Sequence, residues 1–277
     1  MEANRVDAAV TEEVLLGYGI IIAGGLSRRM GTDKALLPVG APPRSEPMLS
    51  HIARQMYPWC ERLFIAAGDE ARAARYRSAL AEATSGMGEE QPERGTRPSD
   101  DGAVDLDHRG AAEPGERANY GHPGADDSWS LAMADIGWVV DRYAGGGPLA
   151  GLHAALAAVA AQQLRSEGSR LDEYGLVMAC DMPRICPSLL QRMLETARDT
   201  QADIVCVEGQ PFHALYHART ARTIGEMLAA DERRLMQLLN RVHTVHVEPT
   251  TEERQIFTPL NTPDAYRKYR KDEEGGA

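Results

Sequence analysis

The sequence predicts an α/β fold, a Rossmann-like three-layer sandwich with a mostly parallel central sheet. Short apolar runs alternate with longer segments of amphipathic or alanine-rich helical pattern. The first two apolar runs are separated by one such helical segment, and a strand–helix–strand unit of this kind places its strands parallel. A glycine turn follows the first run at once, where open α/β sheets bind their ligands.

The first third of the chain gives the clearest elements. Residues 19–23 are rich in β-branched side chains and are typical of a buried strand. A proline-rich loop at 38–47 leads to an amphipathic helix at 48–57 and a second core strand at 62–67. Residues 71–83, rich in alanine and arginine, are expected to form the next helix.

A third strand is expected at 136–141, followed by a tight turn at 147–151 and an alanine-rich helix at 152–164. Pro187 suits the first turn of a later helix, because its missing N–H has no intrahelical partner there. The remaining expected elements are strands at 174–181, 203–207, 212–217 and 243–248, and helices at 187–198, 220–230 and 233–242.

Between about residues 84 and 130 the pattern is lost. Glycine, proline and acidic residues dominate, and too few large apolar side chains are present to offset the entropy of ordering. We therefore expect a disordered acidic insertion, with a docking arm for a partner as the functional alternative. The expected organisation is a tail at 1–16, a single domain at 17–270 interrupted at about 84–134, and a C-terminal tail at 271–277.

Composition excludes several classes of function. The formal net charge is −11, but residues 82–135 hold 13 acidic and 4 basic residues, and the remainder is nearly neutral at 28 against 26. No basic nucleic-acid face is indicated. No apolar run approaches a transmembrane length, and the N-terminus lacks a secretory pattern. Four scattered cysteines without a C-x-x-C pair favour a reducing compartment. We expect a cytoplasmic protein that binds neither nucleic acid nor membrane.

The glycine turn after the first strand is lined with cations. Gly24 and Gly25 mark a sharp turn or a close approach to a ligand. A hydroxyl, two guanidinium groups and an ammonium group then follow within one loop: Ser27, Arg28, Arg29 and Lys34. Backbone N–H groups and positive charges both favour phosphate oxygens, so a nucleotide site is predicted. A basic surface loop is the alternative.

Asp181 is the second candidate, because it closes the fourth strand and is followed by Met182 and Pro183. Mg²⁺ in nucleotide sites typically uses one or two carboxylates together with phosphate oxygens and water. A turn or capping aspartate is the structural alternative. Residues 23–34, 141–151 and 180–183 all follow strands, so we expect them to converge at one edge of the sheet.

The loop string A-G-G-x-S-x-R-M-G-x-D-K-A fits neither a Walker loop, because the spacing is too long, nor the dinucleotide fingerprint, because its glycines are adjacent. It resembles the nucleotidyltransferase superfamily and, within it, the MobA-like molybdenum cofactor guanylyltransferases. C-D-x-P at 180–183, G-P-L-A-G at 147–151 and N-T-P-D at 261–264 resemble further elements of that family.

The resemblance implies Mg²⁺-dependent transfer of GMP from GTP to Mo-molybdopterin, giving molybdopterin guanine dinucleotide and pyrophosphate. It implies that Asp181 is the metal ligand and that Lys34 and Arg29 offset phosphate charge. The implied nucleotide-binding residues are Ile22, Ala23, Gly24, Gly25, Ser27, Lys34, Asp141, Gly147, Pro148, Leu149 and Asp181. The implied residues on the pterin side are His213, Arg234 and Asn261. The implied partners are GTP, Mo-molybdopterin, and molybdoenzymes or cofactor chaperones.

Several of these residues also have structural interpretations. Thr262 and Pro263 make a good helix start, Asp141 suits a solvated strand end, and a strand histidine such as His213 often simply packs. The expected second strand ends without the asparagine that guanylyltransferases tend to place near the base. A cytidylyltransferase acting on the same pterin is therefore the enzyme alternative, and a non-catalytic nucleotide- or cofactor-binding adaptor is the alternative outside catalysis.

Overall fold

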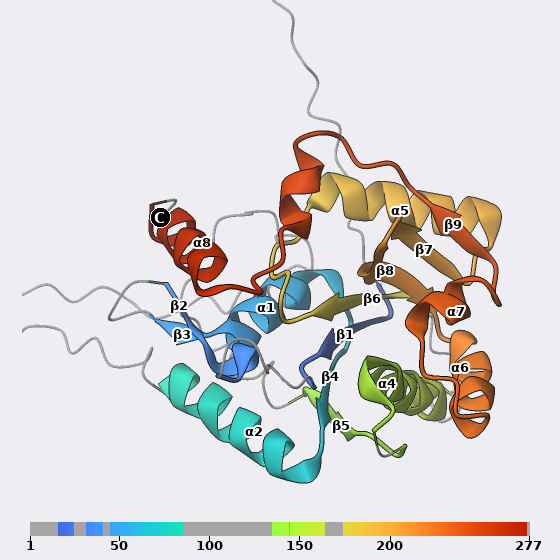
Figure 1. Ribbon diagram of the computed structural model, residues 1–277, viewed down its shortest axis with the longest axis horizontal. Coiled ribbons are helices and arrows are strands. Elements are labelled where there is room, and N and C mark those ends of the chain that lie inside the picture. Colours follow the sequence, from blue (N-terminus) through green and yellow to red (C-terminus); the bar gives the residue numbers. More distant parts are fainter. Residues whose placement is uncertain are drawn as a thin grey trace, which may run out of the picture.

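The computed structural model describes residues 16–24, 32–40, 45–85, 135–143, 145–163 and 174–275. In these residues a seven-stranded sheet of order β5-β4-β1-β6-β8-β7-β9 lies between two layers of helices (Figure 1). The predicted α/β sandwich is confirmed. The strands are β1 (Tyr18–Ile22), β4 (Leu63–Gly68), β5 (Gly137–Val140), β6 (Tyr174–Ala179), β7 (Ile204–Val207), β8 (Gln210–His217) and β9 (Thr244–His246), with β2 (Pro38–Val39) and β3 (Glu46–Pro47) in a separate ribbon.

The helices lie between these strands along the chain, although β7 leads directly to β8 and α6 directly to α7. They are α1 (Met48–Met56), α2 (Glu70–Ser85), α4 (Gly147–Gln163), α5 (Pro187–Thr200), α6 (Thr220–Ala229), α7 (Leu235–Leu239) and α8 (Pro263–Gly275). Three short 3₁₀ helices accompany them: η1 (Lys34–Leu36), η2 (Tyr57–Trp59) and η3 (Glu253–Phe257). None of the helices in the described residues combines the length and apolar character needed to span a membrane.

The sheet is parallel across its first half. β5, β4, β1 and β6 pair in parallel, whereas β8 runs antiparallel to both of its neighbours, β6 and β7. β7 and β9 are again parallel. Because parallel strands end at the same edge, the carboxyl ends of β1, β4, β5 and β6 lie side by side.

The β-branched run of β1 is explained by burial on both faces. Ile21 packs in the core that includes α1, α2 and α5, while Ile20 and Ile22 pack in the core that includes α4, α6 and α7. Successive side chains of a strand alternate between faces, so a strand covered by helices on both sides needs apolar residues throughout. Figure 1 shows the sheet between these layers.

Several boundaries differ from the sequence-based expectation, three of them the most. Residues 147–151 form the beginning of α4 and not a turn before it, because Gly147 enters with φ +62° and Pro148 needs no N–H donor in the first turn. α7 is shorter than the expected 233–242, and its buried residues are only Leu238 and Leu239. α8 continues to residue 275, into the expected tail. The expected insertion at 84–134 lies outside the described residues from residue 86 onward.

Candidate functional site

The ends of β1, β4 and β5 are in direct contact at the carboxyl edge of the sheet. The Gly24 backbone N–H donates to the Ala66 carbonyl at 3.0 Å, and the Asp141 N–H donates to the Gly68 carbonyl at 3.0 Å. An ideal Cβ on Gly24 would lie 3.2 Å from the backbone nitrogen of Gly68. Glycine at residue 24 therefore permits this close approach of the two backbones.

A second group of residues gathers beside the end of β6, and we call it the Lys34 cluster: Lys34, Asp181 and Asn261. The Lys34 ammonium lies 3.7 Å from Asp181 Oδ2 and donates a hydrogen bond to Asn261 Oδ1. The Leu260 N–H donates to the Asp181 carbonyl at 2.8 Å and so fixes Asn261 next to the turn after β6. In the described residues, the three segments expected to converge lie at this edge.

The Lys34 cluster suits binding of a metal–phosphate group. The side chains of Lys34 and Asp181 are 18% and 30% exposed, so both are partly desolvated but accessible. Among the described residues, no three His, Cys, Asp or Glu side chains gather into a metal site of their own. One accessible carboxylate is nevertheless the donor that Mg²⁺ needs when phosphate oxygens and water complete its coordination. The residues present therefore fit Mg²⁺ held jointly with a nucleotide.

Asp141 follows β5, and its side chain is partly buried. Its Oδ1 is buried and has no hydrogen-bond partner, and it lies 3.4 Å from where a Cβ on Gly151 would be. Burial raises the pKa of Asp141 to about 6, while Arg72 lowers it and Asp69 raises it. A buried acceptor without a donor is costly unless a ligand supplies one, so Asp141 is a candidate for recognition of a base.

Two site residues on α2 were missed by the sequence reasoning. Tyr76 places its hydroxyl against Asp33, and the Arg72 guanidinium lies 3.6 Å from Asp69 Oδ2 and beside Gly68. The expected helix at 71–83 gives Arg72 and Tyr76 a common face, because residues four apart lie on one side of a helix, but it does not indicate which partners that face meets. α2 begins at Glu70, shortly after β4 ends at Gly68, so this face starts near the carboxyl edge of the sheet.

The other implied nucleotide residues fall into two groups. Ile22 and Ala23 are buried where β1 ends; Leu149 is buried in the first turn of α4, whereas Gly147 and Pro148 are exposed there. The remaining implied residues of the loop, Gly25, Ser27 and Arg29, lie outside the described residues.

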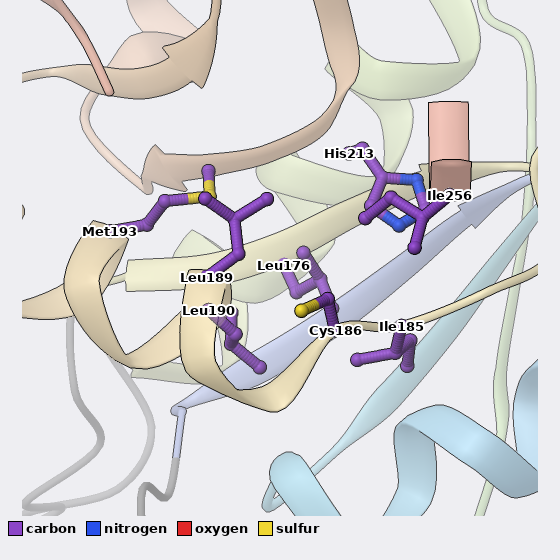
Figure 2. A pocket seen from close by; sticks show the side chains of 8 residues that line it. All are labelled: Leu176, Ile185, Cys186, Leu189, Leu190, Met193, His213 and Ile256. Atoms are coloured by element: carbon purple, nitrogen blue, oxygen red, sulfur yellow. The ribbon is translucent and has the colours of Figure 1, made fainter. Parts of the chain in front are cut away.

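His213 lies in an apolar pocket between β6, α5 and η3 (Figure 2). Leu176, Leu189, Met193 and Ile256 are among the side chains that line it. Burial lowers the pKa of His213 to about 4, although the Arg184 backbone raises it, and neither ring nitrogen has a hydrogen bond of normal geometry. The imidazole is therefore neutral near pH 7. Its pterin-side role stays a prediction.

Arg234, the other implied pterin-side residue, is exposed directly before α7. The neighbouring Arg233 donates a hydrogen bond to the Gly145 carbonyl at 3.0 Å. This contact joins the segment before α7 to the loop that enters α4. Asn261, in contrast, lies within the Lys34 cluster, and its neighbour Thr262 accepts the Ala265 N–H at 3.2 Å, as expected for the helix start.

Comparison with known proteins identifies relatives of this arrangement. The model of the MobA-like NTP transferase domain matches residues 19–96 and 119–246. A probable molybdenum cofactor guanylyltransferase of Geobacillus sp. (strain WCH70) is 29% identical over 151 residues, which cover 52% of this chain and 72% of that protein. A probable molybdenum cofactor guanylyltransferase of Pelotomaculum thermopropionicum is 27% identical over 264 residues, covering 93% of both chains.

The fold is also similar to that of a solved structure. The crystal structure of molybdopterin-guanine dinucleotide biosynthesis protein A from Archaeoglobus fulgidus superposes with a TM-score of 0.55 at 16% identity, covering 92% of this chain and 97% of that one. At this identity the likeness concerns the fold alone.

Proposed function

Because the chain belongs to the MobA-like NTP transferase family, we propose that it transfers GMP from GTP to Mo-molybdopterin in a Mg²⁺-dependent reaction that releases pyrophosphate. The observation that carries the proposal is the Lys34 cluster, in which an ammonium group and an accessible carboxylate lie 3.7 Å apart at the carboxyl edge of the sheet. The choice of substrates is supported by relatives named probable molybdenum cofactor guanylyltransferase, at 29% and 27% identity.

The proposed chemistry needs little covalent participation by the protein. A terminal phosphate oxygen of the pterin attacks the α-phosphorus of GTP in line; the bond from that phosphorus to the bridging oxygen breaks, and pyrophosphate leaves. Mg²⁺, when bound, neutralises charge on the phosphates. Asp181 holds the metal, Lys34 offsets charge that develops on the phosphate oxygens, and Asn261 directs the Lys34 ammonium toward them.

In this proposal, Asp141 recognises the base of the nucleotide. Guanine presents two adjacent donors, its ring N–H and its exocyclic amino group, and one ionised carboxylate can accept both. The Watson–Crick edge of cytosine offers an amino group next to ring and carbonyl acceptors, which an ionised carboxylate would repel. The unpartnered Oδ1 of Asp141 therefore favours guanine over cytosine.

Calorimetric titration of the purified protein with GTP, CTP and ATP in the presence of Mg²⁺ tests this proposal. We expect GTP to bind most tightly, and release of pyrophosphate from GTP to require Mo-molybdopterin. Preference for CTP would instead indicate a cytidylyltransferase with the same mechanism. Absence of binding by all three nucleotides would contradict the proposal.

The affinity for GTP should depend on pH through Asp141. With a pKa of about 6, roughly nine-tenths of this carboxyl group is protonated at pH 5, so GTP should bind about tenfold more weakly there than at pH 7.5. The Asp141→Asn variant should bind GTP weakly at both pH values, so that its affinity no longer changes between pH 5 and pH 7.5. Asp69→Asn removes the neighbouring acidic charge and should lower the pKa of Asp141. The change in GTP affinity with pH should therefore remain but occur at lower pH.

Stability provides an independent control for the same variant. The pKa of Asp141 is raised on folding, so its ionisation lowers the free energy of unfolding as the pH rises from about 4 to 6. Asp141→Asn should therefore not lower the melting temperature at pH 7.5. A GTP affinity that is unchanged by the substitution would contradict the assignment of Asp141 to the base.

A further inference from the structure

A buried tyrosine on α2 contacts both ends of the segment that follows β1. The Tyr76 side chain is fully buried, and its hydroxyl lies 2.8 Å and 3.0 Å from the two carboxylate oxygens of Asp33. The same hydroxyl lies 3.2 Å from the Ala23 carbonyl. Ala23 comes directly before Gly24, and Asp33 directly before Lys34, so one hydroxyl connects the residues on either side of segment 24–32.

Asp33 passes this constraint to Lys34. Its Oδ1 accepts the Ala35 backbone N–H at 3.2 Å and caps η1, the short helix that begins at Lys34. Arg75 approaches Asp33 Oδ2 at 3.4 Å from the solvent side, where its own side chain is 61% exposed. The position of the Asp33 carboxylate therefore sets where η1 begins and from where Lys34 reaches toward Asp181.

The Tyr76 hydroxyl stays protonated near neutral pH and therefore acts as a hydrogen-bond donor. Burial raises the pKa of Tyr76 well above its usual range, and the Asp33 carboxylate raises it further. Its single proton faces three acceptor oxygens, with Asp33 Oδ2 the nearest. A buried hydrogen bond to an ionised carboxylate is stronger than one between neutral groups.

Other buried tyrosines of the fold contact different partners. The Tyr174 hydroxyl donates to the backbone carbonyls of Ala197 and Ala202, at 3.1 Å and 2.7 Å, at the far end of α5. Tyr174 is the first residue of β6 and therefore lies at the edge of the sheet opposite to the candidate site. Tyr76 differs because its partners are Ala23, directly after β1, and Asp33, directly before Lys34 of the candidate site.

We infer that Tyr76 is a positioning residue, which holds Asp33 beside the Ala23 carbonyl and thereby directs Lys34 toward the phosphates of a bound nucleotide. The identity of that nucleotide rests on the proposed function. The Tyr76 hydroxyl itself touches no reacting atom in this arrangement. It acts through Asp33 and through the beginning of η1.

The test compares Tyr76→Phe with Tyr174→Phe, since each substitution keeps the ring and removes one buried hydroxyl. Without nucleotide, amide hydrogen exchange in the 32–37 peptide should be about tenfold faster in Tyr76→Phe and unchanged in Tyr174→Phe. With Mg²⁺, GTP and Mo-molybdopterin, Tyr76→Phe should lose about tenfold to a hundredfold in kcat/KM, whereas Tyr174→Phe should keep the wild-type value even where its melting temperature falls.

Asp33→Asn is the second variant, because asparagine still offers an oxygen to Tyr76 and Ala35. It should retain more activity than Asp33→Ala. Equal exchange and equal activity in Tyr76→Phe and Tyr174→Phe would overturn the inference. Wild-type protein that fails to bind GTP would overturn the proposed function, and the hydrogen-exchange comparison would still decide whether Tyr76 holds Asp33 and the beginning of η1 in place.

Discussion

Replacing Asp181 by alanine should abolish nucleotidyl transfer and leave the fold intact. Asp181 supplies the one carboxylate of the Lys34 cluster, so its removal leaves Mg²⁺ without a protein ligand in the proposed site. Loss of such charge stabilisation in the transition state typically costs about a hundredfold to a thousandfold in rate. The side chain is 30% exposed, and the Lys34 ammonium keeps its hydrogen bond to Asn261 and its access to solvent, so the substitution should cost little stability.

The measurement is the rate of pyrophosphate release from GTP in the presence of Mo-molybdopterin over a range of Mg²⁺ concentrations, combined with thermal unfolding. Asp199→Ala is the matched control, because Asp199 is an exposed aspartate on α5. The control should keep the wild-type rate, and both variants should unfold near the wild-type temperature. Retention of turnover by Asp181→Ala would remove Asp181 from the metal site.

The sequence was sufficient for the layer architecture and for the side of the sheet that carries the site. Ile20, Ile21 and Ile22 predict a strand covered on both faces, and β1 is buried on both faces. Since the carboxyl ends of parallel strands meet at one edge, the positions of Gly24 and Asp181 after their strands already placed them near one another. The apolar pattern of the strands and the rule that parallel strands end at one edge were enough to predict this arrangement.

The pairings within the site could not be predicted in the same way. Lys34 and Asn261 are separated by 227 positions in the chain and meet only because the segment before α8 returns beside β6. Tyr76 and Asp33 meet because α2 packs against β4 and beside η1, the short helix that follows Asp33. Local patterns carry no information on which side chains face each other after such packing.

Residues with a positive φ could not be predicted from the sequence either. His213 has φ +75°, where a residue with a side chain is strained, and Gly147 enters α4 with φ +62°. The sequence around His213 reads as an ordinary strand, and G-P-L-A-G is compatible with either a turn or the beginning of a helix. Only the packing of β8 against α5, and of α4 on the sheet, decides between the alternatives.

Replacing Lys34 by alanine should produce the second large loss of activity. The ammonium is 18% exposed, lies 3.7 Å from Asp181 and donates to Asn261, so its charge is aimed at one place. We expect kcat/KM to fall about a hundredfold or more, since a preorganised charge in a partly desolvated site stabilises the transition state strongly. Lys34→Arg should restore little activity, because the planar guanidinium is larger and cannot replace a compact point charge held by Asn261.

Steady-state kinetics with GTP and Mo-molybdopterin, together with GTP affinity by calorimetry, separates the contributions of Lys34 to binding and to turnover. Lys271→Ala, an exposed lysine on α8, is the control and should behave as wild type. If Lys34 and Asp181 act on the same phosphates, the Lys34→Ala/Asp181→Ala double variant should lose much less than the product of the two single losses. Full additivity would mean that the two side chains act at separate sites, contrary to the proposed mechanism.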